Sequence, residues 1–295
     1  MKKKIILYVF LAAFFFATME VTLKVAGSEM DPLQLTFLRF IIGGLFLVPF
    51  GFRENKSNAY KLKGKDYLWL LMLGILCIPV SMLLFQLGIM NSNASTAAVL
   101  MSVNPLFTMI LAYFVLKESL NKRKIGGFLL GLIGIVFMIR PWNLQEGNTL
   151  LGAMLMLLAA ITFGLYTVMG KIRLEKIGLF RQTCISFLMG SGVLLIFILL
   201  MERPILAGVV ENIWLVLYIG VFVTGLGYYF YFMAIKYAGA TTASIAFFIK
   251  PAMAPLFAVI LLKDVILWNT YVGIGCILAA SFISLMNGIK LKKYR

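Results

Sequence analysis

The chain contains no histidine, only three cysteines and few charged residues, and each shortage excludes a class of function. Without histidine, the chain has no His-based acid or base and no His-ligated metal site. The cysteines Cys77, Cys184 and Cys276 lie far apart inside apolar runs, without the spacing of a disulfide or metal motif. The three aspartates lie in loops or at the ends of apolar runs, so neither an enzyme, a metal site nor a cofactor is expected.

Apolar sequence dominates the chain instead, since 62% of its 295 residues are hydrophobic and 13% are charged. A helix needs about 20 residues to cross the roughly 30 Å of hydrocarbon in a bilayer. Ten runs fit, which predicts an all-α integral membrane protein with ten transmembrane helices. The predicted spans are residues 5–25, 33–52, 67–87, 94–115, 124–140, 150–170, 180–201, 212–232, 240–262 and 268–288.

The net charge of +16 comes from Lys and Arg residues that lie almost wholly in short loops between the apolar runs. Nucleic acid is therefore not expected as a partner. Basic residues gather in alternate loops, which places both the N and C termini in the cytoplasm. The basic inner segments are residues 2–4, 53–65, 117–124, 171–181, 236 and 290–295. We expect a multi-pass protein of the cell membrane, the inner or plasma membrane of a prokaryote, with the lipid bilayer as its surroundings.

One long stretch occurs twice in the chain. Leu87 to Glu118 falls on Met233 to Asp264 without a gap when the sequence is shifted by about 146 positions. A repeat of this length indicates a duplicated structural unit. Because five spans are an odd number, the two halves must be inverted relative to one another: residues 1–146 form the first five-helix repeat and residues 147–295 the second. Inverted repeats around a site at the bilayer midplane are typical of secondary transporters.

Three charged residues, Glu20, Arg39 and Lys250, lie too far inside predicted spans to be placed in loops. A charge near the bilayer centre costs roughly 2.5 to 3.5 kcal/mol on insertion scales, so each should face the interior of the bundle and have a partner. Lys250 falls at the midplane, and its repeat mate is Asn104. We expect both to contact substrate.

Each of these two residues precedes a proline, Pro105 or Pro251. Proline removes a backbone hydrogen bond from a helix and disfavours the helical conformation of the residue before it. One interpretation is a kink that only serves helix packing. The other is a role of both prolines in gating.

Glu20 and Arg39 lie in the outer halves of adjacent spans, which leaves two interpretations open. They form a structural ion pair, or Glu20 carries a proton or meets a substrate amine while Arg39 fixes the second span. Lys24, four residues after Glu20, is a competing partner. Glu20 is a candidate for proton coupling because burial of a carboxylate favours its protonated form.

Aromatic residues are candidates for the wall of a pocket, although most such rings simply pack or face lipid. Tyr166 and Tyr228 are favoured because a tyrosine hydroxyl inside the bilayer needs a hydrogen-bond partner. Phe16 in the first span is a third candidate for contact with substrate.

At these residues the chain resembles the drug/metabolite transporter superfamily, and specifically its ten-helix EamA type. The resemblance covers essentially the whole chain. The segments that carry it are DPLQLTFLRF (residues 31–40), the A[ST]TA segments before the two prolines, LKE and LKD at helix ends, and FGLYTVMGK in the sixth span. The family implies two inverted five-helix repeats, a central cavity and export or exchange of amino acids and other small metabolites. The chain departs from many relatives at Lys250-Pro251, where they resemble "EP", and at Phe16-Ala17, where they resemble a tryptophan-glycine pair.

These observations predict a secondary transporter that exports a small metabolite with a carboxylate, an amino acid or a related zwitterion. If Glu20 and Arg39 neutralise one another, Lys250 remains positive at the midplane and favours an anionic group. An alternative is an organic cation or quaternary amine held by Glu20 and aromatic rings through cation–π contacts. A flippase for a lipid carrier is a third hypothesis.

Overall fold

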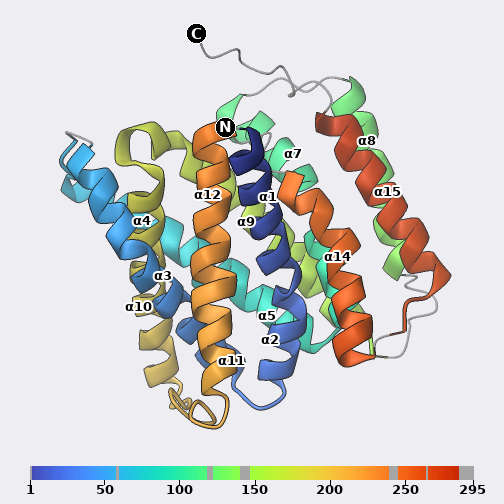
Figure 1. The fold of residues 1–295 in the computed structure, drawn as a ribbon, viewed down its shortest axis with the longest axis horizontal. Helices are drawn as coiled ribbons and strands as arrows, with labels where there is room; N and C mark the ends of the chain where they lie inside the picture. The colour runs from blue at the N-terminus through green and yellow to red at the C-terminus, as the bar shows by residue number, and fades with distance from the viewer. Residues whose placement is uncertain are drawn as a thin grey trace.

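The computed structural model describes residues 2–57, 60–117, 122–139, 147–238, 245–263 and 265–285. Within these ranges all regular structure is helical (Figure 1). This agrees with the composition, because a helix satisfies its backbone hydrogen bonds within one segment and can therefore lie in lipid. The C-terminal basic tail, the second A[ST]TA segment and the acidic residues Glu118 and Asp264 lie outside the described residues.

The described residues of the first half form nine helical elements. They are α1 (Lys2–Ala17), α2 (Met19–Gly27), α3 (Pro32–Ser57), α4 (Gly64–Ile75), the π-helix η1 (Leu76–Met82), α5 (Leu83–Met90), α6 (Ala94–Met101), α7 (Asn104–Leu116) and α8 (Lys122–Ile139). The elements described in the second half are α9 (Leu150–Ile177), α10 (Leu179–Leu200), α11 (Ile213–Leu217), the π-helix η2 (Tyr218–Leu226), α12 (Gly227–Ala238), α14 (Ile245–Leu262) and α15 (Trp268–Leu285).

Among the described residues, seven helical segments are long and apolar enough to cross a membrane, which makes the chain a multi-pass membrane protein. They are Lys3–Gly27, Pro32–Glu54, Gly64–Met90, Ala94–Leu116, Leu150–Ile177, Leu179–Leu200 and Ile213–Tyr237. Three shorter apolar helices, Ile125–Phe137, Met253–Leu262 and Trp268–Ala280, fall on the other predicted spans. Seven crossings thus follow from length and composition, and the total of ten stays a prediction.

The two prolines of the repeat have different effects on their helices. Pro105 lies in the first turn of α7, after a turn at Ser102 and Val103 that separates α6 from α7. Proline fits this position because the first N–H groups of a helix have no intrahelical acceptor. Pro251 instead lies inside the continuous helix α14. The fourth predicted span is therefore broken, whereas its repeat mate is not broken over the residues described.

Helices that correspond in the two halves run antiparallel to each other. Near the middle of α3 and α10, the rings of Phe40 and Phe187 lie 4.8 Å apart between centroids. At the end of α3, the Glu54 carboxylate accepts hydrogen bonds from the first backbone N–H groups of α10, those of Leu179 (3.0 Å) and Arg181 (2.9 Å). The end of one helix thus meets the start of the other, as the predicted inversion of the halves requires.

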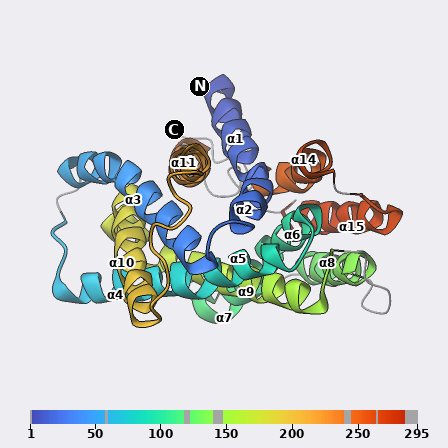
Figure 2. The same ribbon diagram turned by 90° about the horizontal axis from the view of Figure 1, so that it is seen from below.

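The corresponding helices α8 and α15 also pack against each other in an antiparallel arrangement, at the other end of the protein (Figures 1 and 2). Gly134 lies against Cys276, and the Asn269 amide donates to the carbonyl of Phe137 at 3.4 Å, so numbers rise along one helix as they fall along the other. α3, α4 and α10 form the opposite end of the bundle. Two pairs of corresponding helices therefore support inverted repeats.

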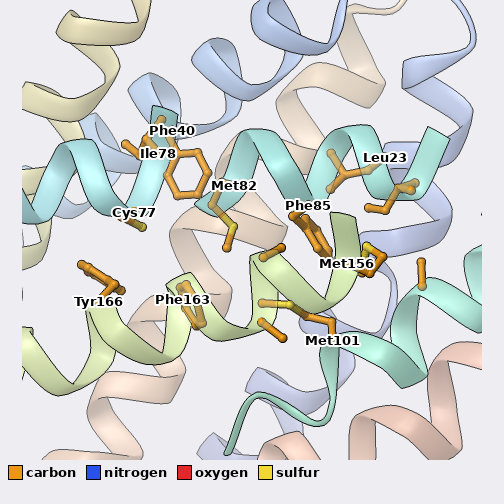
Figure 3. Packing of buried hydrophobic residues seen from close by; sticks show 14 of the residues in the cluster. Leu23, Phe40, Cys77, Ile78, Met82, Phe85, Met101, Met156, Phe163 and Tyr166 are labelled. Carbon is orange, nitrogen blue, oxygen red and sulfur yellow. The ribbon is translucent and has the colours of Figure 1, made fainter. Parts of the chain in front are cut away.

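In the centre of the bundle, a helix of each half packs against helices of the other half. α1 packs on α12 and α14, and its counterpart α9 packs on η1, α5, α6 and α7. The contact between α9 and the span that contains η1 and α5 is lined by Met82, Phe85, Met156 and Phe163, all buried (Figure 3). The first span therefore lies against the second half, and the sixth span against the first half.

The first described helix begins, and the last one ends, on the same side of the bundle (the top of Figure 1). This agrees with an even number of crossings. The cytoplasmic location of that side stays a prediction, as does the domain boundary after residue 146, which borders residues outside the described part.

Candidate functional site

The buried charged residues Glu20 and Lys250 form an ion pair between the two halves. Glu20 is in the first turn of α2, and Lys250 precedes Pro251 in α14. The Oε1 atom of Glu20 lies 2.5 Å from the Nζ atom of Lys250, and the two residues are 0% and 2% exposed. The second carboxylate oxygen, Oε2, has no hydrogen-bond partner among the described residues. Charged side chains inside a membrane bundle usually pair with an opposite charge, and Glu20 and Lys250 do so here.

This pairing differs from both partners that the sequence suggested for Glu20. The expected Glu20–Arg39 ion pair is wrong, because the short contact of Glu20 is with Lys250. Lys24 has other acceptors: its Nζ atom donates to the carbonyls of Ile89 (3.1 Å), Met90 (3.2 Å) and Ser92 (2.7 Å). An ammonium near the last carbonyls of a helix also interacts favourably with the helix dipole, so Lys24 stabilises the end of α5.

Arg39 lies in α3 and is 1% exposed. Its Nε, Nη1 and Nη2 atoms have no hydrogen-bond acceptor among the described residues. The guanidinium carbon lies 4.6 Å from the ring centroid of Phe40 and 5.6 Å from that of Phe85, so aromatic rings supply its nearest favourable contacts. Tyr228, Cys77 and Glu20 are close enough to interact electrostatically with it.

Phe85 connects the two cations of the site. Lys250 Nζ lies 5.9 Å from the same ring centroid that Arg39 contacts, and Phe85 is fully buried on α5 (Figure 3). The next residue, Gln86, donates to the carbonyl of Leu23 at 3.3 Å and holds α5 against α2. Analysis of the sequence missed Phe85, although Gln86, a polar residue within an apolar run, was a signal that this face of the span points inward.

The structure brings two of the predicted aromatic residues together. Phe16 is buried, with its ring 5.4 Å from that of Tyr228 and 5.8 Å from that of Phe247. Tyr228 also packs against Phe187 at 5.1 Å, in an edge-on arrangement. Phe187 in turn packs against Phe40, whose ring Arg39 contacts, so this cluster forms an aromatic wall that extends to the charged residues.

Tyr166, the third predicted aromatic residue, lies on α9 and is buried against Phe163, with ring centroids 5.5 Å apart. Its electrostatic neighbours are Cys77 and Tyr228. Cys77, on η1, lies close to Tyr166 across the contact between η1 and α9 (Figure 3). Cys77 and Tyr228 are also electrostatic neighbours of Arg39, so Tyr166 belongs to the same buried region.

Asn104 holds two helices together. Its amide nitrogen donates to the carbonyl of Ala160 on α9 at 2.7 Å, and its amide oxygen accepts from the Thr108 hydroxyl at 3.3 Å. The repeat mates Asn104 and Lys250 have thus diverged, one toward a contact between helices and the other toward an ion pair. The predicted contact of Asn104 with substrate stays a prediction, as do the gating roles of the two prolines.

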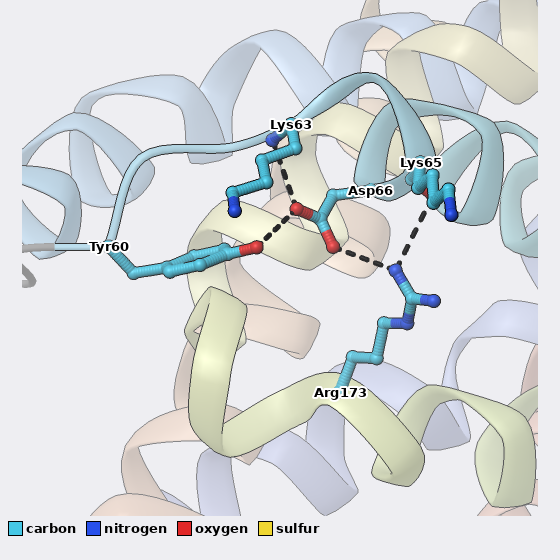
Figure 4. A network of polar contacts seen from close by, with 5 residues as sticks. All are labelled: Tyr60, Lys63, Lys65, Asp66 and Arg173. Atoms are coloured by element: carbon cyan, nitrogen blue, oxygen red, sulfur yellow. Dashed lines mark hydrogen bonds and ion pairs between the residues drawn. The ribbon is translucent and has the colours of Figure 1, made fainter.

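Residues at the predicted cytoplasmic side join the two halves through Asp66 (Figure 4). Its Oδ2 atom accepts from the Tyr60 hydroxyl at 2.6 Å and from the Lys63 backbone N–H at 3.0 Å. Its Oδ1 atom lies 2.7 Å from Nη1 of Arg173 on α9. The start of α4 is therefore tied to the end of α9.

A weaker set of contacts joins the halves at the opposite side. The Asp31 carboxylate lies 3.8 Å from Nη1 of Arg203, which is half exposed, and Asn212 donates to the Glu29 carboxylate at 2.7 Å. Both ends of the bundle are thus bridged while the three central charged residues are sealed from solvent.

The centre can bind charge, but it has few groups for other chemistry. One carboxylate and two cations give it a net charge of +1 when all three groups are ionised. Within the ranges described, no group of three or more Cys, Asp or Glu side chains converges where a metal ion could be held. The charge of this buried group of residues is therefore positive overall.

The two halves of the chain each match the same family model, that of the EamA-like transporter family, over residues 3–140 and 150–286. The chain belongs to the EamA-like transporter family. This confirms the resemblance to the drug/metabolite transporter superfamily, and it agrees with the internal duplication because one model matches twice.

Proteins that are similar to this EamA-like transporter are themselves named as transporters. An uncharacterized transporter of Clostridium kluyveri is 38% identical over 96% of this chain and 93% of its own length. An uncharacterized transporter of Bacillus subtilis is 26% identical over 90% of both chains. An S-adenosylmethionine uptake transporter of Rickettsia prowazekii is 29% identical over 52% of this chain and 49% of its own.

A solved crystal structure has the same fold as this EamA-like transporter. The TM-score is 0.69 at 16% sequence identity, and the alignment covers 99% of this chain and 100% of the other. Family and relatives together make the chain a membrane transporter of small molecules.

Proposed function

We propose that this transporter moves a small metabolite with a carboxylate group, an amino acid or a related zwitterion, by alternating access around the central charged residues. The observation that carries the proposal is the net positive charge of Glu20, Arg39 and Lys250, sealed inside the bundle. An anionic substrate group would neutralise this charge, whereas a cation would add to it. S-adenosylmethionine, named for the Rickettsia relative, has the carboxylate and ammonium groups of an amino acid and also a sulfonium cation, so that name fits both this class and an organic cation.

Alternating access follows from the relation between the halves. One ion pair joins the halves near each end of the bundle, at Asp66 and at Asp31. Opening one end while the other stays bridged would expose the centre to one side at a time, as inverted repeats allow. Glu20 couples this movement to protons in our proposal, because its protonation releases Lys250 from the ion pair.

Export is the direction we propose, as expected for the EamA type. The name of the Rickettsia relative instead gives uptake, so direction needs its own measurement. Everted and right-side-out membrane vesicles that contain the transporter separate the two directions. Accumulation of a labelled amino acid in everted vesicles on acidification of their interior indicates export, and accumulation only in right-side-out vesicles contradicts it.

An organic cation is a second candidate, favoured by the aromatic wall that Phe16, Tyr228 and Phe247 form. Such rings attract cations through their faces. However, Glu20, the only carboxylate of the three charged residues, already has Lys250 as its counter-ion. The observed pairing therefore supports the carboxylate substrate over the cation.

Counterflow in proteoliposomes tests the class of substrate. Vesicles loaded with an unlabelled mixture of amino acids should accumulate labelled amino acids, and protein-free vesicles should not. Tetraethylammonium should not compete. Counterflow of labelled tetraethylammonium into vesicles loaded with unlabelled tetraethylammonium, together with no accumulation of any amino acid, would show that the carboxylate class is wrong.

A further inference from the structure

Arg39 is a buried cation without an acceptor for its hydrogen bonds. All three side-chain nitrogens lack a hydrogen-bond partner among the described residues, and the residue is 1% exposed. Leaving a buried charge unpaired strongly destabilises a fold. Intramembrane charges without a structural partner are typical of substrate and ion pathways. Burying the Arg39 guanidinium without an acceptor is energetically unfavourable. A ligand that accepts its hydrogen bonds would offset this cost.

The contacts of Arg39 hold the guanidinium but leave its donors available. Phe40 and Phe85 lie 4.6 and 5.6 Å from the guanidinium carbon and stabilise the charge through their ring faces. Neither side chain has an oxygen that could accept an N–H hydrogen bond. A guanidinium presents its N–H groups as a planar fork that matches the two oxygens of a carboxylate.

The other cation of the centre is already engaged. Lys250 Nζ lies 2.5 Å from the Glu20 carboxylate, so this pair is neutral as a unit. Lys250 and Arg39 lie near the same ring, Phe85. Glu20 also attracts Arg39 at longer range, but one carboxylate cannot neutralise two cations, and the cation without an ion pair is Arg39. The sequence alone indicated the opposite assignment, with Lys250 as the cation left over.

We infer that Arg39 is the residue that binds the carboxylate of the transported molecule, through paired hydrogen bonds of its guanidinium. The inference rests on the proposed function and names the anchoring group within it. Lys250 serves Glu20 and does not bind the carboxylate. A ligand whose carboxyl group is esterified loses both its negative charge and its second equivalent oxygen, and is rejected.

Thermal unfolding of the purified full-length protein in detergent gives a test that does not depend on transport. A ligand that binds only the folded state raises the unfolding temperature. The probes are the protein amino acids and the methyl ester of each one. We expect one or more amino acids to raise the midpoint of wild-type protein, and their methyl esters to leave it unchanged.

Two variants of Arg39 separate binding from structure. Arg39→Met should raise the midpoint in the absence of ligand, because it removes an unpaired buried charge, and should lose the response to amino acids. Arg39→Lys keeps the charge without the fork, so the concentration needed for half of the response should rise roughly tenfold. As the control, Arg203→Gln removes a half-exposed cation far from the centre, and it should still distinguish the acids from their esters.

The outcomes distinguish the inference from the proposed function. If no amino acid shifts the wild-type midpoint and tetraethylammonium does, the proposed function fails and the inference fails with it. If amino acids act and Arg39→Met responds like wild type, only the assignment to Arg39 is overturned. Failure of Arg39→Met to fold also overturns it, because a binding residue without a structural partner should not be needed for folding.

Discussion

Glu20 on α2 and Lys250 on α14 meet inside the bundle with 2.5 Å between Oε1 and Nζ, although 229 positions separate them in the chain. The contact joins the first span of the chain, in one half, to the ninth span, in the other half. A single ion pair thus connects the halves near the predicted midplane, where alternating access requires that they move relative to one another.

The first prediction concerns the stability of this pair. Glu20→Gln and Lys250→Met should each lower the free energy of unfolding by about 3–5 kcal/mol, because each leaves one charge buried without its partner. The double variant should lose less than either single variant. Chemical unfolding in detergent, followed by tryptophan fluorescence, measures all three. If the single effects simply add in the double variant, the two residues are not coupled in the folded protein.

The second prediction concerns protons. If Glu20 carries a proton during transport, the transport rate of the wild-type protein should change between acidic and alkaline pH, because protonation of Glu20 releases Lys250. Glu20→Gln should transport at a rate that no longer follows pH, since glutamine does not titrate. Exchange of a labelled amino acid in proteoliposomes at a series of pH values provides the measurement. A wild-type profile as flat as that of the variant would remove Glu20 from coupling.

The third prediction concerns the bridge at the predicted cytoplasmic side. Asp66→Asn should lower stability by about 1–3 kcal/mol, because the buried carboxylate accepts from Tyr60, Lys63 and Arg173 (Figure 4). It should also favour the arrangement that is open on this side. Labelling of a cysteine introduced in place of Ser186, on the inner face of α10, reports that opening when a membrane-impermeant maleimide is used.

The exposed pair at the opposite side is the control for this prediction. Arg203→Gln breaks the 3.8 Å contact with Asp31, and an exposed ion pair contributes only about 0–1 kcal/mol. Its effect on unfolding should be correspondingly small, and labelling from the predicted cytoplasmic side should not rise. Equal labelling of both variants would contradict a specific role of Asp66 in closing that side.

Hydropathy predicted where the spans lie, because each span covers a similar thickness of lipid and leaves a long apolar run. It also placed Glu20, Arg39 and Lys250 inside the bundle. It did not predict that Glu20 pairs with Lys250, because sequence gives the depth of a residue but not the direction in which its side chain points around the helix. Adjacent spans suggested Arg39 as the partner, whereas the fold places α14 beside α2.

The internal repeat was also an incomplete guide to the contacts of individual side chains. It aligned Asn104 with Lys250, but sequence symmetry does not require equal contacts, and the Asn104 amide bonds to α9. Phe85 was missed because one phenylalanine among many in a membrane span carries no signal of its own. Its importance comes from two cations that reach it from α3 and α14.

The last prediction tests the packing of α4 against α10, where Gly74 and Gly190 face each other. A Cβ atom at Gly190 would meet the backbone of Gly74, which cannot move aside as a flexible side chain could. Small residues at such contacts let helix backbones approach closely. Gly190→Ala should therefore destabilise the protein by about 1–3 kcal/mol, the usual range for overpacking.

Gly192 offers a matched control, because it lies two positions further along α10 and a Cβ atom there would meet nothing within 4 Å. Gly192→Ala should stabilise the protein slightly, by about 0.5–1 kcal/mol, since alanine loses less conformational entropy than glycine in a helix. The unfolding temperatures of the two variants should thus move in opposite directions. Equal shifts would mean that α4 and α10 do not approach closely at Gly190, and that the end of the bundle formed by α3, α4 and α10 is packed differently.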